Sequence, residues 1–110
     1  MMSEERDIID RVFDVVASRK GGDPAASYVA SLYAKGVKKI SEKVGEEAVE
    51  TIIAANAEGR DEVIAESADL LFHLMVLWAE LGLTPDDIRA ELARREGMSG
   101  HEEKASRPKD

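Results

Sequence analysis

The 110-residue sequence has no cysteine, three prolines, two histidines and very few aromatic residues. The absence of cysteine excludes disulfide frameworks, thiolate nucleophiles and cysteine-ligated zinc. Two histidines are too few for a metal centre built mainly on imidazole. Any metal site must therefore rest on carboxylates, which favour hard ions such as Mg²⁺, with Mn²⁺ as an alternative.

The sequence also lacks a long hydrophobic run and an excess of basic residues. Its longest apolar stretch, 70–79, is interrupted by His73 and falls short of the ~20 residues that a membrane span needs. The first residues do not have the basic and apolar regions of a secretory signal. With 23 acidic and 15 basic residues, the formal net charge is -8, which disfavours nucleic-acid binding. We expect a cytoplasmic protein with neither nucleic acid nor membrane as a partner.

Helical periodicity and capping signals divide the chain into about five helices. The predicted helices begin after Ser3, at Ser27, at Val37, at Asp61 and at Thr84, and they end before 21–24, at Gly36, at Ala55, at Leu81 and near Arg95. No run is typical of a strand, so we predict an all-α helical bundle that forms one domain over 1–96. The polar residues 97–110 are predicted to be a mobile tail. The fourth helix is apolar on nearly every side after Ala68, which predicts burial by a second copy in a homodimer.

Four glutamates lie on the predicted third helix beside an apolar stripe. At roughly 100° per residue, Glu47 borders the stripe while Glu46 and Glu50 face further outward. One interpretation is a solvated helix face on which Lys43 pairs with neighbouring acids. Lys39 and Lys43 lie one turn apart beside these acids and could instead contact phosphate oxygens.

The predicted fourth helix carries a second row of polar residues, namely Glu62, Glu66, Asp69 and His73. Because apolar residues flank Asp69 along the chain, we expect its carboxylate to be buried, at a cost of at least ~2 kcal/mol if unpaired. Two antiparallel helices, each with an acid pair at i and i+3, can bring four carboxylates together. A multivalent cation would relieve their repulsion, and oxygen-rich coordination favours Mg²⁺.

The remaining polar and aromatic candidates have structural interpretations. His73 could reach the acidic site, but we interpret it as a core histidine bonded to another side chain. Trp78 and the two tyrosines could stack on a base, but isolated aromatics on helices are more typical of a core.

The run from Lys39 to Glu50, KISEKVGEEAVE, and the run from Glu66 to His73, ESADLLFH, together resemble a known family. They are similar to the phosphoribosyl-ATP pyrophosphohydrolases of histidine biosynthesis, which belong to the MazG-like all-α nucleotide pyrophosphohydrolases. The shared pattern is an acid pair Glu-x-x-Glu and a second pair Glu-x-x-Asp. Further agreement comes from Ser27-Tyr28, Leu32 and Lys35-Gly36, and the resemblance covers roughly residues 8–95.

The resemblance implies Mg²⁺-dependent hydrolysis of 1-(5-phosphoribosyl)-ATP to 1-(5-phosphoribosyl)-AMP and pyrophosphate. It implies that the metal ligands are Glu47, Glu50, Glu66 and Asp69. Glu46 is then the candidate general base or the ligand of a further Mg²⁺, and Lys39 and Lys43 are the candidates for phosphate binding.

Two alternatives remain open at this point. The acids indicate the reaction and the metal but not which nucleobase the substrate carries. A related enzyme that cleaves ordinary or damaged nucleoside triphosphates would therefore have the same pattern. A hypothesis of another class is a non-catalytic helical dimer whose acids form a cation-binding face.

Overall fold

The computed structural model describes residues 6–108, which form six helices and no strand. The helices are α1 (Ile8–Ser18), α2 (Tyr28–Lys35), α3 (Val37–Ala57), α4 (Arg60–Glu80), α5 (Pro85–Arg95) and α6 (Gly100–Ser106). The prediction of an all-α fold is confirmed. Among the described residues, no helix is both long enough and apolar enough to cross a membrane.

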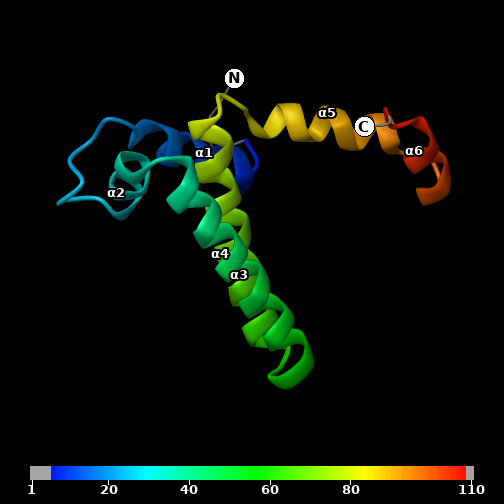
Figure 1. Ribbon diagram of the computed structural model, residues 1–110, viewed down its shortest axis with the longest axis horizontal. Helices are drawn as coiled ribbons and strands as arrows, with labels where there is room; N and C mark the ends of the chain where they lie inside the picture. The colour runs from blue at the N-terminus through cyan, green and yellow to red at the C-terminus, as the bar shows by residue number, and fades with distance from the viewer. Residues whose placement is uncertain (1–5, 109–110) are drawn as a thin grey trace.

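Helices α3 and α4 form a long antiparallel hairpin that projects from the rest of the chain (Figure 1). Each has 21 residues, so each is about 31 Å long. Helices α1 and α2 pack against the base of this hairpin, where the core lies. The core consists of Phe13, Val16, Val29, Leu32, Tyr33, Ile40, Met75 and Val76. The outer part of the hairpin therefore has little apolar cover within one chain.

Local capping signals in the sequence fix the ends of α2 and α5 as expected. The Ser27 side chain accepts a hydrogen bond from the Ala30 amide, and Gly36 ends α2 with a φ of 87°, a conformation that favours glycine. Thr84 and Asp87 form a reciprocal capping box at the start of α5.

Other boundaries differ from the prediction. Helix α1 begins at Ile8, with Asp7 as its N-cap, and the predicted cap Ser3 lies outside the described residues. The α3–α4 turn is shorter than expected because α3 continues to Ala57 and α4 begins at Arg60.

The segment predicted as a tail contains α6, which Ser99 and Glu102 cap by the same reciprocal arrangement. A buried carboxylate, Glu103, attaches α6 to α5. Its oxygens lie 3.1 Å from Arg94 Nη2, 3.5 Å from Arg95 Nε and 2.6 Å from Arg107 Nε.

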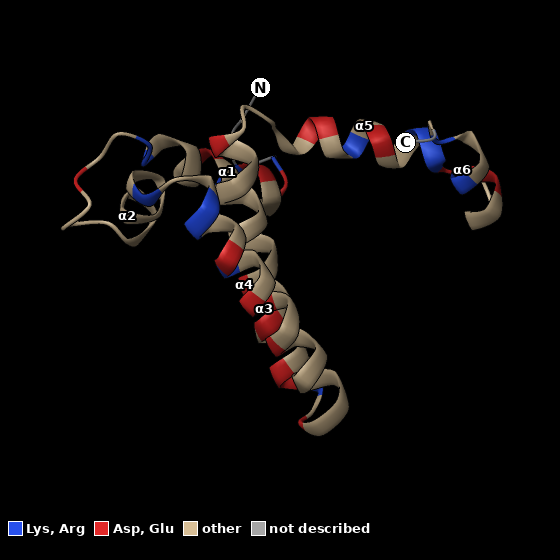
Figure 2. Cartoon of the chain, in the orientation of Figure 1, with Lys and Arg blue, Asp and Glu red and all other residues tan. Residues whose placement is uncertain are grey.

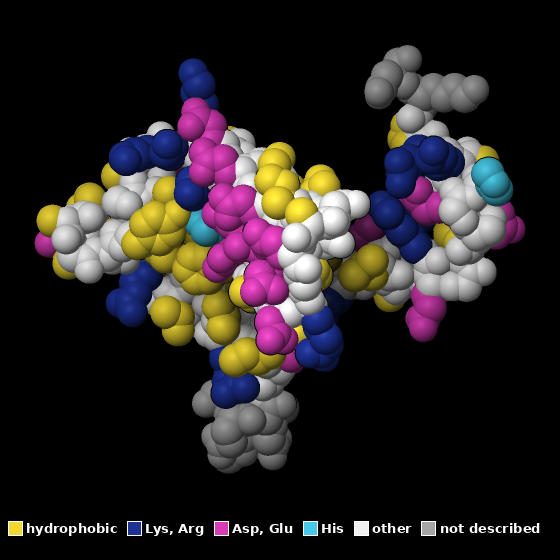
Figure 3. All heavy atoms as spheres, turned by 90° about the horizontal axis from the view of Figure 1, so that it is seen from below, with side chains coloured by type: hydrophobic (Ala, Val, Ile, Leu, Met, Phe, Trp, Pro, Cys, Tyr) yellow, Lys and Arg dark blue, Asp and Glu magenta, His cyan; other side chains and the backbone are white. Residues whose placement is uncertain are grey.

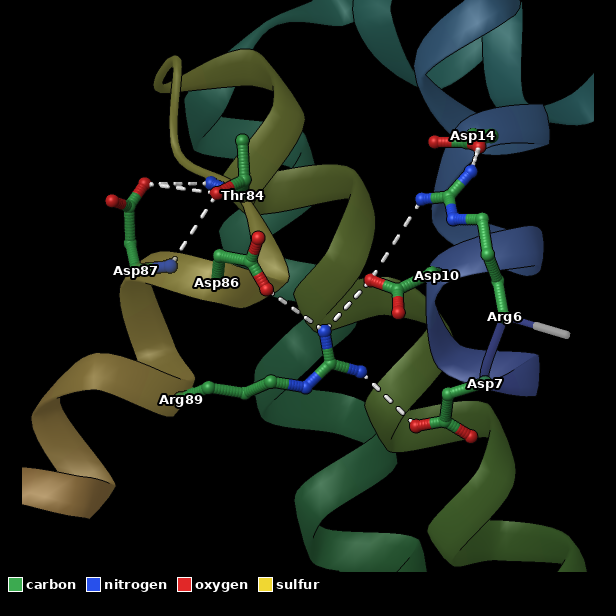
Figure 4. Close-up of polar contacts among 8 residues, drawn as sticks. All are labelled: Arg6, Asp7, Asp10, Asp14, Thr84, Asp86, Asp87 and Arg89. Carbon is green, nitrogen blue, oxygen red and sulfur yellow. Dashed lines mark hydrogen bonds and ion pairs between the residues drawn. The ribbon is translucent and has the colours of Figure 1, made fainter. Parts of the chain in front are cut away.

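Arginine Arg89 joins α5 to α1 (Figure 4). Its guanidinium donates to Asp10 at 2.7 Å, to Asp7 at 3.0 Å and to Asp86 at 3.1 Å. The Arg89 bond lowers the pKa of Asp10. Arg6 pairs with Asp14 on the neighbouring turn of α1. The acids of this junction are therefore neutralised by arginines.

Candidate active site

The two acid pairs meet along the α3–α4 hairpin, where acidic residues follow one another in Figure 2. Glu47 and Asp69 lie at nearly the same separation from the hairpin turn, to within one residue, and so do Glu50 and Glu66. Antiparallel pairing therefore places each acid of α3 opposite an acid of α4. The spacing of three within each helix keeps both pairs on the shared face.

Three of these acids form a compact group of oxygens. One carboxylate oxygen from each of Glu47, Glu66 and Asp69 lies within 4.8 Å of the others. Glu47 is 7% exposed, and its Oε1 atom and the Oε1 atom of Glu66 are buried without a hydrogen-bond partner. Buried carboxylate oxygens without a donor are costly, so these atoms fit a site that a cation would complete.

The pKa of Glu66 also indicates that these carboxylates lie close together. Burial raises the pKa of Glu66 above its ordinary value, and a hydrogen bond to Glu50 and the charge of Glu50 raise it further. Asp69 and Glu47 add smaller contributions of the same sign. Glu50, although exposed, is thus a near neighbour of Glu66, and the other three predicted acids all act on Glu66.

The expected burial of Asp69 is wrong, because its side chain is exposed in the chain. Neighbours along a helix point in directions 100° apart, so the apolar residues that follow Asp69 do not surround its carboxylate. Asp69 lies at the rim of an apolar groove of about 400 Å³ between α1 and α4. The buried acid is instead Glu47, in agreement with its expected position beside the apolar stripe. That stripe, which runs along α3 through Ile40 and Ile52, is itself only partly buried, since Ile40 is enclosed while Ile52 is 60% exposed.

The predicted phosphate-binding lysines lie beside the acids and are paired within α3. Lys43 Nζ lies 3.1 Å from Glu46 Oε1 and 3.9 Å from Glu47 Oε2. Lys39 Nζ lies 3.4 Å from Glu42 Oε1. The ion pairs of the alternative interpretation are therefore present. Lys43 also reaches the edge of the carboxylate group, whereas Lys39 is paired one turn away.

His73 is a buried histidine bonded to another side chain, as interpreted from the sequence. Its Nε2 lies 2.8 Å from the hydroxyl oxygen of Tyr28, and its Nδ1 lies 2.8 Å from the backbone carbonyl oxygen of Asp69. The expectation that both tyrosines belong to the core is confirmed for Tyr33 and wrong for Tyr28, which is 53% exposed. The Ser27 cap signalled that Tyr28 begins α2, but no sequence signal pointed to its contact with His73.

The face that carries these residues is strongly acidic. In Figure 3, acidic side chains form a continuous band, with basic side chains near both of its ends and hydrophobic ones along its flank. Such a band repels a polyphosphate unless cations are bound to it. Once a divalent cation is held, the same oxygens and the adjoining lysine can neutralise phosphate charge and align a water molecule.

Comparison with known proteins agrees with this chemistry. Residues 9–96 match the family model described as phosphoribosyl-ATP pyrophosphohydrolase. Proteins named phosphoribosyl-ATP pyrophosphatase are similar over almost their whole length. The one from Paramagnetospirillum magneticum is 55% identical over 98% of this chain and 99% of its own. The one from Rhodospirillum rubrum is 57% identical over 94% and 88%, and the one from Rhizorhabdus wittichii is 58% identical over 92% and 95%.

Proposed function

The chain belongs to the phosphoribosyl-ATP pyrophosphohydrolase family, and from this premise we propose that it hydrolyses 1-(5-phosphoribosyl)-ATP to 1-(5-phosphoribosyl)-AMP and pyrophosphate. This is the second step of histidine biosynthesis. The observation that carries the proposal is the group of carboxylate oxygens from Glu47, Glu66 and Asp69. Two of these residues, Glu47 and Glu66, each have an Oε1 atom that is buried without a hydrogen-bond partner. We also propose a cytoplasmic location, because the proposed substrate is built on ATP, which the cytoplasm supplies.

The proposed metal ligands are Glu47, Glu50, Glu66 and Asp69. Their donor set consists of carboxylate oxygens alone, which suits Mg²⁺ and, as a second choice, Mn²⁺. The bound metal would supply charge neutralisation on the polyphosphate during attack by water between the α and β phosphates. The buried position of Glu47 and the short hairpin turn hold these ligands on rigid helices.

The remaining residues would handle the water and the phosphates. Glu46 is exposed beside the ligands and is our candidate for general base, or for binding a further Mg²⁺. In that role it must give up its contact with Lys43, whose ammonium would turn to the phosphate. Lys39, one turn away, would bind an outer phosphate.

A comparison of substrates tests the proposed reaction. Purified protein with Mg²⁺ should release pyrophosphate from phosphoribosyl-ATP far faster than from dUTP or dCTP at equal concentration. A strong preference for a deoxynucleotide would contradict this assignment and would favour a (d)NTP pyrophosphohydrolase. Release of pyrophosphate from none of them would favour the non-catalytic cation-binding dimer.

We propose further that the enzyme is a homodimer or higher homo-oligomer in which a second copy covers the apolar hairpin. The chain exposes 7606 Å², against about 6000 Å² for a compact monomer of its mass. Its radius of gyration is 16.2 Å, against about 13 Å for a compact domain of this length. The exposed large hydrophobic residues include Val49, Ile52, Ile53 and Ile64 on the hairpin. A monomeric mass at micromolar concentration by light scattering would contradict this proposal.

A further inference from the structure

Tyr28 is an exposed aromatic side chain whose polar end is fixed. It is the first residue of α2 and is 53% exposed, yet its hydroxyl oxygen lies 2.8 Å from Nε2 of His73, which is only 6% exposed. The two rings meet edge to face, with centroids 5.8 Å apart. Exposed side chains usually change rotamer freely, whereas this hydrogen bond and this ring contact hold Tyr28 in one orientation.

His73, which holds the phenol, is itself held firmly. Its Nδ1 lies 2.8 Å from the backbone carbonyl oxygen of Asp69, and its ring meets the ring of Phe72 with centroids 5.5 Å apart. A backbone carbonyl can only accept, so the Nδ1–H group donates to it. In the neutral imidazole Nε2 is then an acceptor, and the Tyr28 hydroxyl donates to it. The hydroxyl hydrogen is therefore committed to His73, and the exposed ring of Tyr28 is left for contact with a ligand.

This pair of rings lies one helical turn beyond a proposed metal ligand. Asp69 and His73 are four residues apart on α4, which is a rise of about 6 Å along the helix axis. In a nucleotide, a single ribose separates the α phosphate from the base, and its span is of similar length. A substrate whose α phosphate lies at the acids would therefore have its base within reach of the Tyr28 ring.

The base of the proposed substrate differs from the base of ATP in its charge. Its adenine carries the second ribose on N1, and alkylation at N1 makes the ring a stronger base, so that it is protonated and cationic at neutral pH. Purines stack on aromatic side chains, and the electron-rich face of a tyrosine also attracts a cation. The acidic band attracts the same cationic ring. An exposed tyrosine beside this band therefore suits the N1-substituted base better than the neutral base of ATP.

We propose that the ring of Tyr28 stacks on the adenine ring of phosphoribosyl-ATP and favours this charged base over the neutral base of ATP. His73 is a positioning residue, because it fixes the Tyr28 ring through the hydroxyl group. The inference deepens the proposed function and rests on it, since the proposed metal ligands would place the phosphates from which the distance to the base is reckoned.

Two variants of Tyr28 isolate the contribution of its ring. Tyr28→Leu and Tyr28→Phe both remove the hydroxyl, but only the Leu variant removes the aromatic face. For phosphoribosyl-ATP, we expect KM to rise about tenfold in the Leu variant, with kcat near the wild-type value, and to stay near the wild-type value in the Phe variant. Calorimetry controls for the lost hydrogen bond to His73, which should lower the Tm of both variants. Equal KM values for the two variants would overturn the inference.

Inhibition by two product-like nucleotides tests the preference for a charged base. With Mg²⁺, 1-methyl-AMP carries the cationic ring and AMP carries the neutral one, and each should compete with phosphoribosyl-ATP. In Tyr28→Leu, the inhibition constant of 1-methyl-AMP should rise about threefold more than that of AMP, which is the effect of a cation on an exposed aromatic face. An equal rise for both nucleotides would overturn the proposed preference.

A binding measurement by NMR separates the inference from the proposed reaction. The ring protons of Tyr28, assigned by the loss of their signals in Tyr28→Leu, should shift upfield when 1-methyl-AMP and Mg²⁺ are added, because a stacked purine shields them. The ring protons of Tyr33, which is buried in the core, are the internal control and should not shift. If the wild type does not hydrolyse phosphoribosyl-ATP, the proposed function fails, and the shift of Tyr28 still decides the inference. Unshifted Tyr28 signals would overturn it even in an active enzyme.

Discussion

The acids of the α3–α4 hairpin and the acids of α5, α6 and their junction with α1 have opposite surroundings. Around Arg89, three aspartates share one guanidinium, and Glu103 is surrounded by three arginines. On the hairpin, four acids lie close together, and within residues 6–108 the one basic side chain that pairs with any of them is Lys43, at their edge. The compensated acids hold helices together, whereas the uncompensated acids are the ligands of the cation that we propose. The same residue type thus serves two purposes in one small chain.

The largest expected effect comes from neutralising an acid of the hairpin. Glu50→Gln and Asp69→Asn should each reduce pyrophosphate release by more than ~100-fold, since even the outer partners of metal ligands can contribute that much. Pyrophosphate release from phosphoribosyl-ATP at saturating Mg²⁺ is the measurement. Glu91→Gln, which removes a carboxylate paired with Arg94 and Arg95, is the control and should retain the wild-type rate. If both hairpin variants remain active, the proposed metal site is wrong.

The next effect concerns stability with and without the metal. Mg²⁺ at a hundred times its Kd should stabilise the wild type by about 2.7 kcal/mol, seen as a higher Tm in calorimetry. Glu47→Gln should lose most of this gain because it removes a ligand. Without metal, Asp69→Asn should be as stable as the wild type or more so, because a repelled charge is lost. If Mg²⁺ still raises the Tm of both variants by as much as that of the wild type, the cation binds elsewhere.

A smaller effect is expected from removing a cation at the α1–α5 junction. Arg89→Met should lower Tm by a few degrees, because three aspartates lose their shared donor and repel one another. The rate of pyrophosphate release should not change. Arg60→Met removes an ion pair with Asp61 in which both side chains are almost fully exposed, so it should leave Tm unchanged. Equal Tm values for the two arginine variants would show that the junction is not held by these charges.

The smallest expected effect concerns pH, because the contributions of Glu91 and Glu66 to stability change with pH in opposite directions. Arg94 and Arg95 lower the pKa of Glu91 to about 2, so the stabilisation from Glu91 is present above its unfolded pKa and is lost as pH falls towards 2. Burial and Glu50 raise the pKa of Glu66, so its contribution is favourable below the unfolded pKa and is lost as pH rises through the folded one. Carboxyl carbon NMR titration of the metal-free protein should place the Glu91 midpoint below the Glu66 midpoint. The reverse order would contradict the comparison.

Much of the fold could be predicted from local signals. Ser27, Gly36 and the Thr84 capping box fix helix ends through contacts within a few residues. The cap of α6 was present in the sequence as well, since Ser99 and Glu102 repeat the arrangement of Thr84 and Asp87. The glycines around this cap and the polar composition favour a tail instead, whereas the cap itself predicts the helix that the structure contains.

The sequence by itself determined which acids pair within a helix, because a spacing of three residues on a helix places two side chains on one face. It also placed Glu47 beside the apolar stripe. Only the tertiary structure decided that Glu47 is buried while Asp69 is exposed, and that Tyr28 meets His73 across 45 residues of sequence. The physical reason is that helical periodicity acts over one or two turns. The surroundings of a side chain depend instead on which helices pack against its face, and the α3–α4 turn and the docking of α1 and α2 set that packing.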